Sequence, residues 1–348
     1  MLPFKRPMFC PAVKSVLTIL ALTLTLNYIP FTGLAQQEEQ RPRRVESQPQ
    51  KPPAKPGQKE QPPQEEADAI KIKSSLVTVP VSVSNAAGDP VTNLAAKDFR
   101  LEEEGEQQSV TLLAQPGKNP VDLALLFDIS GSVLDKFQFE QQAAARFLKK
   151  VVNPGDHVTV FSIALKPRLA TPRTAQVTEA IAGIESLVPS KEATAFFDGV
   201  GNAAKFLGEK ATPGARRVLI VISDGEDNQS DYYTLEQSLR ELQRNDCIFY
   251  SINPSGPSIW LNKISIKGQD AMIALAAETG GVAFLPAKLE DLDRIFVQIA
   301  NELQTQYLLG YYPINETTDG KFRRITARVP GRPELRVRSR QGYYAPKD

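Results

Sequence analysis

Between residues 121 and 305, apolar runs of strand length alternate with amphipathic stretches of helical length, and this alternation constrains the fold most strongly. The apolar runs are Val121–Phe127, His157–Ala164, Arg217–Ser223, Ile248–Asn253 and the shorter Val282–Leu285. The amphipathic stretches are Phe137–Val152, Val177–Leu187, Phe197–Leu207, Leu235–Arg244, Asp270–Glu278 and Leu289–Thr305. Continuous apolar strands that alternate with helices are typical of a parallel sheet covered on both faces. We therefore expect an α/β domain over residues 120–305, with a Rossmann-like, doubly wound, mostly parallel sheet.

The segment that precedes this domain has a period of two instead. Its apolar positions are Val77, Val79, Val81 and Val83. Such alternation predicts a strand with one buried face, and two further short strands are expected near residues 99–101 and 110–112. Pro80 has no backbone N–H to donate, so it predicts that the first strand is an edge strand or carries a bulge.

Strand-like runs return at the carboxyl end of the chain, in Tyr307–Tyr312, Phe322–Val329 and Leu335–Ser339. The amino-terminal strands alone, about 45 residues, bury too little surface to fold independently. We therefore expect the segments 69–116 and 306–348 to pair into one small β-sandwich beside the α/β domain. The carboxyl-terminal strands also carry seven arginines, and alternation predicts that most of them lie on a solvated face. They are Arg323, Arg324, Arg328, Arg332, Arg336, Arg338 and Arg340.

The first 35 residues have the pattern of an export signal. A positive segment precedes the apolar run Val16–Leu26, and Gly33-Leu34-Ala35 provides the small residues that a signal peptidase reads. We expect an exported protein, in the periplasm, the cell envelope or the extracellular space. The alternative is an uncleaved membrane tether, because Ser15–Ala35 is just long enough to span a bilayer, although Asn27 and Pro30 interrupt it.

Residues 36–68 are rich in Gln, Glu, Pro and Lys and poor in aliphatic residues, which predicts a disordered linker. Cleavage after Ala35 leaves Cys247 as the one cysteine, so no intramolecular disulfide is expected, and its apolar neighbours predict a buried thiol. The net charge of +1 gives no reason to expect a nucleic-acid partner. His157 is the one histidine of the chain, which argues against a Ser-His-Asp mechanism.

Two strands of the expected sheet are followed directly by polar oxygen-bearing residues. Asp128, Ser130 and Ser132 follow the first apolar run, and Asp224 follows the third. Ligands of open α/β sheets bind outside the carboxyl ends of the strands, where these side chains would meet. Carboxylates and hydroxyls without His or Cys form a hard oxygen set that suits Mg²⁺, Mn²⁺ or Ca²⁺ better than Zn²⁺ or copper.

Asp128-x-Ser130-x-Ser132, together with Thr194 and Asp224-Gly225, resembles the metal-ion-dependent adhesion site (MIDAS) of von Willebrand factor A domains. A lone D-x-S-x-S pattern is weak, because such residues also form turns and helix N-caps. Here Thr194 lies 62 residues after Ser132, and Asp224 lies 30 residues further on, as that fold requires. The resemblance implies metal ligands at Asp128, Ser130, Ser132, Thr194 and Asp224. In that family the hydroxyls contact the metal, the aspartates act mostly through water, and one position stays open for an acidic group of a partner.

The wider layout resembles a group of exported bacterial proteins with a signal, a Pro-rich tether, a short β segment and an A-type domain. In that group the β segment carries an Asp-Phe pair near its end, as Asp98-Phe99 does here. The resemblance covers nearly the whole mature chain, but no common activity of the group comes with it.

The leading functional hypothesis is a non-enzymatic, adhesion-type binding module with Mg²⁺, or Mn²⁺ or Ca²⁺, that accepts an acidic residue of a partner protein. One alternative is a metal-assisted hydrolase, although the sequence offers no general base, second metal set or phosphate-binding loop. Another is a structural envelope protein in which the metal only stabilises the fold. Asp198 has two interpretations, as a support for the Thr194 loop or as a carboxylate at a helix N-terminus.

Overall fold

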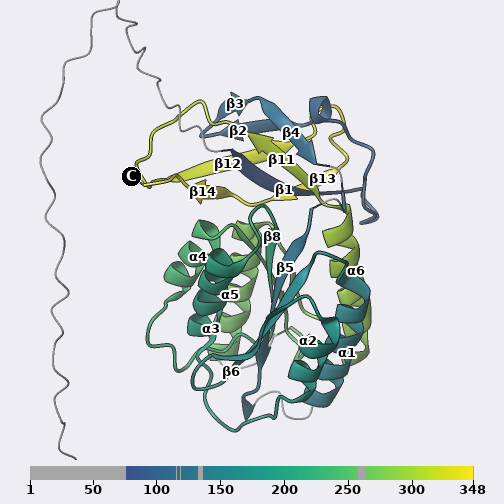
Figure 1. Cartoon of the computed structure of the whole chain (residues 1–348), viewed down its shortest axis with the longest axis vertical. Coiled ribbons are helices and arrows are strands. Elements are labelled where there is room, and N and C mark those ends of the chain that lie inside the picture. The colour runs from purple at the N-terminus through teal and green to yellow at the C-terminus, as the bar shows by residue number, and fades with distance from the viewer. Residues whose placement is uncertain (1–75, 115, 118, 132–135, 258–262, 348) are drawn as a thin grey trace, which may run out of the picture. The chain divides into compact units, whose positions relative to one another are not determined.

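Six strands of the α/β domain form one sheet in the order β10-β9-β8-β5-β6-β7. The structure is a computed structural model that describes residues 76–347 apart from 115, 118, 132–135 and 258–262 (Figure 1). The expected signal, the expected linker, Ser132 and residues 69–75 of the amino-terminal β segment therefore lie outside the described residues. The strands of this sheet are β5 (Val121–Asp128), β6 (His157–Ile163), β7 (Arg168–Thr174), β8 (Arg216–Ile222), β9 (Cys247–Ile252) and β10 (Ala283–Phe284).

The sheet is parallel except at one edge. β5 pairs in parallel with both β6 and β8, β8 pairs in parallel with β9, and β9 with β10, whereas β7 runs antiparallel to β6. All eight residues of the central strand β5 are buried. Burial on both faces explains why β5 is apolar at every position from Leu123 to Phe127 rather than alternating.

Three helices cover each face of this sheet (Figure 1). One core packs Leu123, Leu125 and Phe127 of β5 against α1 (Phe137–Val151), α2 (Val177–Glu185) and α6 (Leu292–Thr305). The other core packs Ala124 and Leu126 of β5 against α3 (Phe196–Lys210), α4 (Leu235–Arg244) and α5 (Lys263–Thr279). A short 3₁₀ turn, η3 (Leu289–Asp291), precedes α6. The doubly wound α/β fold expected from the sequence is confirmed.

Two elements differ from the sequence-based expectation. β7 was not expected, because most of its residues are exposed or half-buried and its pairing with β6 is irregular, so it lacks an apolar run. α5 begins at Lys263 rather than near Asp270, and its first turns leave Ile264 and Ile266 exposed. Because apolar residues lie on the exposed side of these first turns, the sequence there lacks the amphipathic pattern that would predict where the helix begins.

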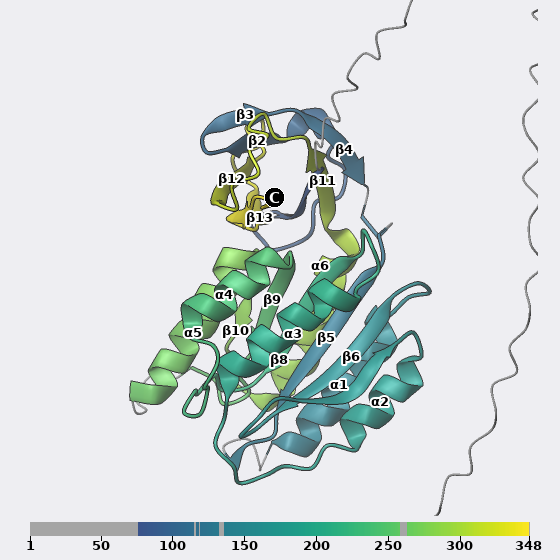
Figure 2. The ribbon, with the colours of Figure 1, turned by 60° about the vertical axis from the view of Figure 1, so that its left-hand side comes forward.

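The remaining strands form two antiparallel four-stranded sheets in the orders β13-β1-β11-β4 and β14-β12-β2-β3. Four come from the amino-terminal side, β1 (Val77–Ser84), β2 (Arg100–Glu103), β3 (Glu106–Gln108) and β4 (Val110–Ala114), with the 3₁₀ turn η1 (Ala96–Asp98) before β2. Four come from the carboxyl-terminal side, β11 (Tyr307–Tyr311), β12 (Phe322–Arg328), β13 (Arg336–Ser339) and β14 (Gly342–Tyr344). Both sheets mix strands from the two ends of the described chain, which lie together in Figure 2. The expected pairing of the flanking segments into a β-sandwich is therefore observed.

The position of β1 corrects the expectation drawn from Pro80. β1 is an inner strand, with β11 on one side and β13 on the other. Pro80 is tolerated there because β13 pairs only with Val81–Ser84, so no strand residue is paired on that side of Pro80. At Pro80, β1 is therefore an edge strand on its β13 side, and the missing N–H of proline removes no hydrogen bond between these two strands.

A buried polar cluster lies inside the sandwich. The carboxylate of Glu103 accepts hydrogen bonds from the hydroxyls of Tyr311 and Tyr343 at 2.5 and 3.0 Å, and lies 3.4 Å from the guanidinium of Arg323. Arg324, Arg328, Arg332 and Arg336 are exposed as expected, but Arg323 and Arg340 are buried and Arg338 is half-buried. For those three the expectation of a solvated face is wrong, because each pairs with an acidic residue: Glu103, Asp246 and Glu302, respectively.

The segment after β13 joins the sandwich to the α/β domain. The backbone N–H of Gln341 donates to the carbonyl of Glu278 at 3.0 Å, and Arg338 Nε donates to the carbonyl of Gly280 at 2.9 Å. A Cβ at Gly280 would lie 2.7 Å from the backbone nitrogen of Arg340, and its φ is +85°. Only glycine fits this close approach of two backbones. None of the helices in the described part of the chain is long and apolar enough to cross a membrane.

Candidate metal site

Asp128 is the last residue of β5 and is fully buried at the carboxyl edge of the sheet. Its Oδ1 accepts a hydrogen bond from the backbone N–H of Ser130 at 2.9 Å, and its Oδ2 accepts one from the Ser223 hydroxyl at 2.6 Å. Ser223 follows β8 directly, and β8 neighbours β5 with Ile222 opposite Phe127. The strand register therefore places the Ser223 hydroxyl beside the Asp128 carboxylate.

Burial raises the pKa of Asp128 to about 6. The hydrogen bonds from Ser130 and Ser223 oppose this shift, whereas the nearby charge of Asp224 adds to it. The charged form is disfavoured because a buried carboxylate loses its hydration and the site contains a second carboxylate. A cation beside Asp128 would remove this penalty.

Asp224 follows Ser223 in the loop after β8 and is also buried. Its Oδ1 accepts the backbone N–H of Glu226 at 3.1 Å, while the backbone N–H of Gly225 donates to the Ser223 hydroxyl at 2.9 Å. Gly225 has a φ of +76°, and a Cβ there would lie 2.8 Å from the carbonyl oxygen of Gly268. The glycine after Asp224 is thus required by both the turn and its contact with α5.

Thr194 lies in the loop before α3 and is 4% exposed. The next residue, Ala195, donates its backbone N–H to the carbonyl of Ala164 at 2.8 Å, which fastens this loop to the end of β6. The backbone N–H of Thr194 donates to Asn228 Oδ1 at 2.9 Å, and its carbonyl accepts from the N–H of Asn228. Thr194 is thus tied both to the end of a strand that neighbours β5 and to the loop that carries Asp224.

The structure places four of the five predicted ligands at one edge of the sheet: Asp128, Ser130, Thr194 and Asp224. Ser130 is buried directly after β5, and Gly131 lies 3.7 Å, measured from an ideal Cβ, from the Cα of Lys191 in the Thr194 loop. Ser132, the fifth, lies outside the described residues. In the described part of the chain, no three His, Cys, Asp or Glu side chains cluster closely enough to hold a metal by themselves. A cation here would therefore depend on the hydroxyl groups as well.

Sequence reasoning missed two residues of this region, Ser223 and Glu140. Glu140 lies on α1, fully buried, and neither of its carboxylate oxygens has a hydrogen-bond partner among the residues that the structure describes. Its pKa is raised to about 8, mainly by burial and also by the charges of Asp128 and Asp224, while the charge of Lys136 lowers it. The sequence does contain a pattern that indicates the burial of Glu140. Glu140 lies three residues after Phe137 and four before Ala144, and this spacing places it on the apolar face of the helix.

Asp198, in the first turn of α3, organises the loop that follows Asp224. Its carboxylate accepts the backbone N–H groups of Asp231, Tyr232 and Tyr233 at 3.1, 3.0 and 2.8 Å. Its own backbone N–H donates to the Ser230 hydroxyl at 3.0 Å. Of its two interpretations, the structure favours a support role, although the loop it holds is that of residues 230–233 rather than that of Thr194.

Two observations fit this site to a hard divalent cation. The side chains present are carboxylates and hydroxyls, the oxygen donors that Mg²⁺, Mn²⁺ and Ca²⁺ prefer. The buried acidic groups Asp128 and Glu140 also have raised pKa values, because burial disfavours their charged forms, and a bound cation would offset that penalty.

Residues 123–226 match the von Willebrand factor type A domain family. This range contains Asp128, Ser130, Ser132, Thr194 and Asp224. This match agrees with the six-stranded, mostly parallel sheet flanked by helices.

Several solved structures are similar to this chain. BatB from Bacteroides thetaiotaomicron is 19% identical, with 52% of this chain and 98% of that chain covered and a TM-score of 0.40. The von Willebrand factor domain of the type V pili tip protein Mfa5 from Porphyromonas gingivalis is 13% identical, covering 54% and 95%, with a TM-score of 0.43. Proximal thread matrix protein 1 from the mussel byssus, with a zinc-occupied MIDAS motif, is 15% identical, covering 58% and 49%, with a TM-score of 0.45. The match thus spans about half the length of the mussel protein. No curated protein sequence matches the chain at a significant level.

Proposed function

We propose that this protein is an exported, non-enzymatic binding module in which a divalent metal at the carboxyl edge of the sheet accepts an acidic group from a partner protein. The observation that carries the proposal is the burial of Asp128, with its raised pKa, near Ser130 and Asp224, while the buried Thr194 is hydrogen-bonded to the loop that follows Asp224. Export is supported by the signal-like pattern of residues 1–35. The compartment would be the periplasm, the envelope or the extracellular space, with a tether if the signal is uncleaved.

Asp128, Ser130, Ser132, Thr194 and Asp224 would hold the cation, which is Mg²⁺ in the first instance and Mn²⁺ or Ca²⁺ otherwise. When bound, the metal supplies positive charge to which a partner carboxylate can coordinate. The residues of this chain keep that charge in place. Ser223 and the backbone N–H of Ser130 fix the Asp128 carboxylate, and Asn228 fixes the Thr194 loop against the Asp224 loop. A preorganised site loses less entropy when the partner binds.

The first test is metal binding by isothermal titration calorimetry with Mg²⁺, Mn²⁺ and Ca²⁺. We expect Asp128→Ala to lose binding, because the central carboxylate is removed, while circular dichroism shows an intact fold. Asp231→Ala, which removes an exposed carboxylate from the same loop region, is the matched control and should bind metal normally. Equal metal affinity in wild type and Asp128→Ala would refute the metal site.

The second test is capture of partners from an envelope extract with Mg²⁺ or with EDTA. We expect a partner that is retained with Mg²⁺ and lost with EDTA or with Asp128→Ala. A protein whose melting temperature rises with metal, but whose partners are retained equally in EDTA, would instead be a structural protein stabilised by its metal. Hydrolysis of phosphoesters or peptides that disappears in Asp128→Ala would favour a metal-assisted hydrolase.

A further inference from the structure

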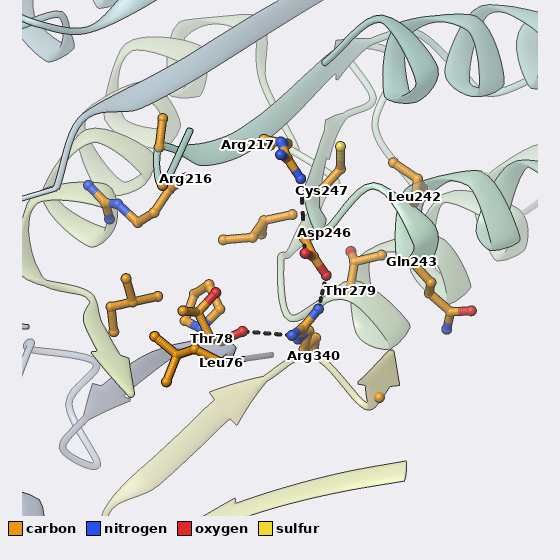
Figure 3. Close-up of a pocket in the computed structure, with 16 residues that line it drawn as sticks. Leu76, Thr78, Arg216, Arg217, Leu242, Gln243, Asp246, Cys247, Thr279 and Arg340 are labelled. Atoms are coloured by element: carbon orange, nitrogen blue, oxygen red, sulfur yellow. Dashed lines mark hydrogen bonds and ion pairs between the residues drawn. The ribbon is translucent and has the colours of Figure 1, made fainter. Parts of the chain in front are cut away.

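A cavity lies at the other edge of the same sheet, where the α/β domain meets the sandwich (Figure 3). It has a volume of about 250 Å³, and its walls include the start of β8, the start of β9, β1 and the segment after β13. Arg216 and Arg217 open β8, whereas Asp224 follows the end of that strand. A strand of this length places the cavity about 20 Å from the candidate metal site. The two sites are therefore separate.

The charges around this cavity are unequal. The sixteen residues that line it include three arginines, Arg216, Arg217 and Arg340, but one acidic residue, Asp246. Figure 3 shows Asp246 between Arg217 and Arg340. Its Oδ2 is 3.9 Å from Arg217 Nη1, and its Oδ1 pairs with Arg340 Nη1. One carboxylate thus serves two guanidinium groups.

The third arginine does not restore the balance, because neutral acceptors hold its Nη atoms. Arg216 donates to the carbonyls of Leu303 and Asn119 at 2.6 and 3.3 Å and to the side chain of Gln306 at 3.3 Å. Burial lowers the pKa of Arg216, whereas the charges of Tyr250 and Asp156, neither of which lines the cavity, raise it. The positive charge of Arg217 and Arg340 therefore remains only partly compensated at the cavity wall.

The hydrogen-bonding capacity of these arginines is also incompletely used. The Nε atoms of Arg216, Arg217 and Arg340 are buried and have no hydrogen-bond partner in the described structure. The Arg340 side chain is 9% exposed and is held by the carbonyl of Thr78, which its Nη2 contacts at 2.6 Å. A buried donor without an acceptor costs free energy, and the cost is larger for a charged group. An anion in the cavity would instead lie beside the guanidinium charge that Asp246 only partly compensates.

The rest of the wall selects the kind of anion. Leu76, Pro80, Leu242, Ile248 and Leu308 provide apolar surface around the arginines. A bare inorganic anion would leave that apolar surface uncovered. If the anion carried two negative charges, the second charge would also be buried close to Asp246. A single carboxylate on a small apolar body satisfies both the guanidinium groups and the apolar walls, and the volume admits a body smaller than a drug-sized ligand.

Asp246 follows Asn245, the C-cap residue of α4, and its φ is +51°. This left-handed conformation is a common way for a helix to end, and aspartate adopts it more readily than most residues. Here the side chain of Asp246 stays 50% exposed while it bridges Arg217 and Arg340. It can therefore turn outward when a stronger acceptor arrives.

We propose that this cavity binds a small organic monocarboxylate, with Arg217 and Arg340 on the carboxylate and the leucine and proline walls on its apolar body. Arg340 belongs to the carboxyl-terminal segment and Arg217 to β8, so the ligand would connect the sandwich to the α/β domain. Binding should then raise the melting temperature of the whole protein, because a ligand that binds only the folded state stabilises it.

The test uses benzoate as the probe, titrated calorimetrically into the full exported chain at constant ionic strength, with inorganic phosphate as the second ligand. We expect benzoate to bind and to raise the melting temperature. Arg217→Gln should weaken binding at least about tenfold, because a charge-assisted hydrogen bond is lost. Ala215→Leu keeps every charge but fills the cavity, so it should also weaken binding. Arg328→Gln removes an exposed arginine from β12 and is the matched control.

Binding of benzoate that is unchanged in both Arg217→Gln and Ala215→Leu would overturn the proposal, as would no binding at all. Phosphate that binds as tightly as benzoate would overturn the role of the apolar walls. Benzoate binding should persist in EDTA and in Asp128→Ala, which separates this site from the proposed metal site. If the metal-site proposal fails, the benzoate result still stands.

Discussion

The carboxyl group of Glu140 is fully buried, near two other carboxyl groups and with no hydrogen-bond donor in the described part of the chain. At the scale of single residues, such a group stays in a folded protein only if it is neutral or if a cation offsets its charge. Its raised pKa describes the first case, in the absence of metal. A divalent cation near Asp128 and Asp224 would provide the second. Glu140 would thus link the stability of the metal-free protein to the proposed metal site.

The metal-free protein should lose stability as the pH rises from about 4.5 to about 8. The ordinary pKa of Glu140 is 4.5 and that of the folded state is about 8, so in this window the folded state binds the proton more tightly than the unfolded state. The stabilisation is complete below pH 4.5 and is lost through pH 8, by up to about 1.4 kcal/mol per pH unit. Glu140→Gln should flatten this dependence, measured by urea unfolding in EDTA at pH 5 and pH 8. Glu185→Gln, an exposed carboxylate, is the control, and a slope unchanged by Glu140→Gln would contradict this assignment.

At the scale of elements, the loop after β8 depends on the first turn of α3. Asp227 accepts the backbone N–H of Phe197 at 3.3 Å, and Asp198 accepts three N–H groups of the same loop. The helix N-terminus and the loop thus satisfy each other's free backbone groups, which would otherwise need water. This exchange positions Asn228, which in turn holds Thr194.

Removal of the Asp198 carboxylate should therefore loosen that loop. Asp198→Ala leaves three N–H groups without their acceptor, and we expect a loss of about 1–3 kcal/mol in the free energy of unfolding. Amide hydrogen exchange at Asp231, Tyr232 and Tyr233 should accelerate, and metal affinity should fall because Thr194 is less well held. Glu209→Ala, at the exposed end of the same helix, should change none of these quantities. Unaltered exchange at the three amides would show that the loop is held by other contacts.

At the scale of the whole described molecule, the sandwich is built from both ends of the chain around an intervening α/β domain. β1 pairs with β11 and β13, and β2 pairs with β12. The core of the sandwich likewise mixes Val79 and Leu101 with Tyr307, Ile325 and Tyr343. Neither set of strands has a complete core without the other, whereas the α/β domain has two cores of its own.

A chain that ends after Gln306 should therefore lose the sandwich and keep the α/β domain. The deletion removes four strands, so the apolar faces of β1 and β2 lose their cover and residues 76–114 should become sensitive to protease. Metal affinity should stay close to that of the full chain, because the candidate ligands lie at the other edge of the sheet. The measurements are limited proteolysis with mass spectrometry and metal titration. Protection of residues 76–114 in the shortened chain would show that these strands fold alone.

The sequence by itself determined the elements whose order follows from local pattern. The alternation of apolar runs and amphipathic stretches predicted the parallel sheet, because strands buried on both faces must be apolar throughout. It also predicted that residues directly after those strands, Asp128 and Asp224, would meet at one edge, because parallel strands end on the same side. The period of two in β1 predicted a strand with one buried face, which its alternating burial confirms.

Only the tertiary structure decided the partners of residues that are far apart in the chain. Arg340 and Asp246 lie 94 positions apart, and nothing local distinguishes Arg340, which is buried, from Arg336, which is exposed. The position of Pro80 in an inner strand depended on where β13 begins to pair, and the depth of Glu140 depended on how α1 packs over β5. Burial and electrostatic pairing are properties of the packed chain. The sequence therefore indicated the edge of the sheet where a metal would bind. Only the fold decided that the carboxyl group of Glu140 lies near that edge and that the arginines lie at the other one.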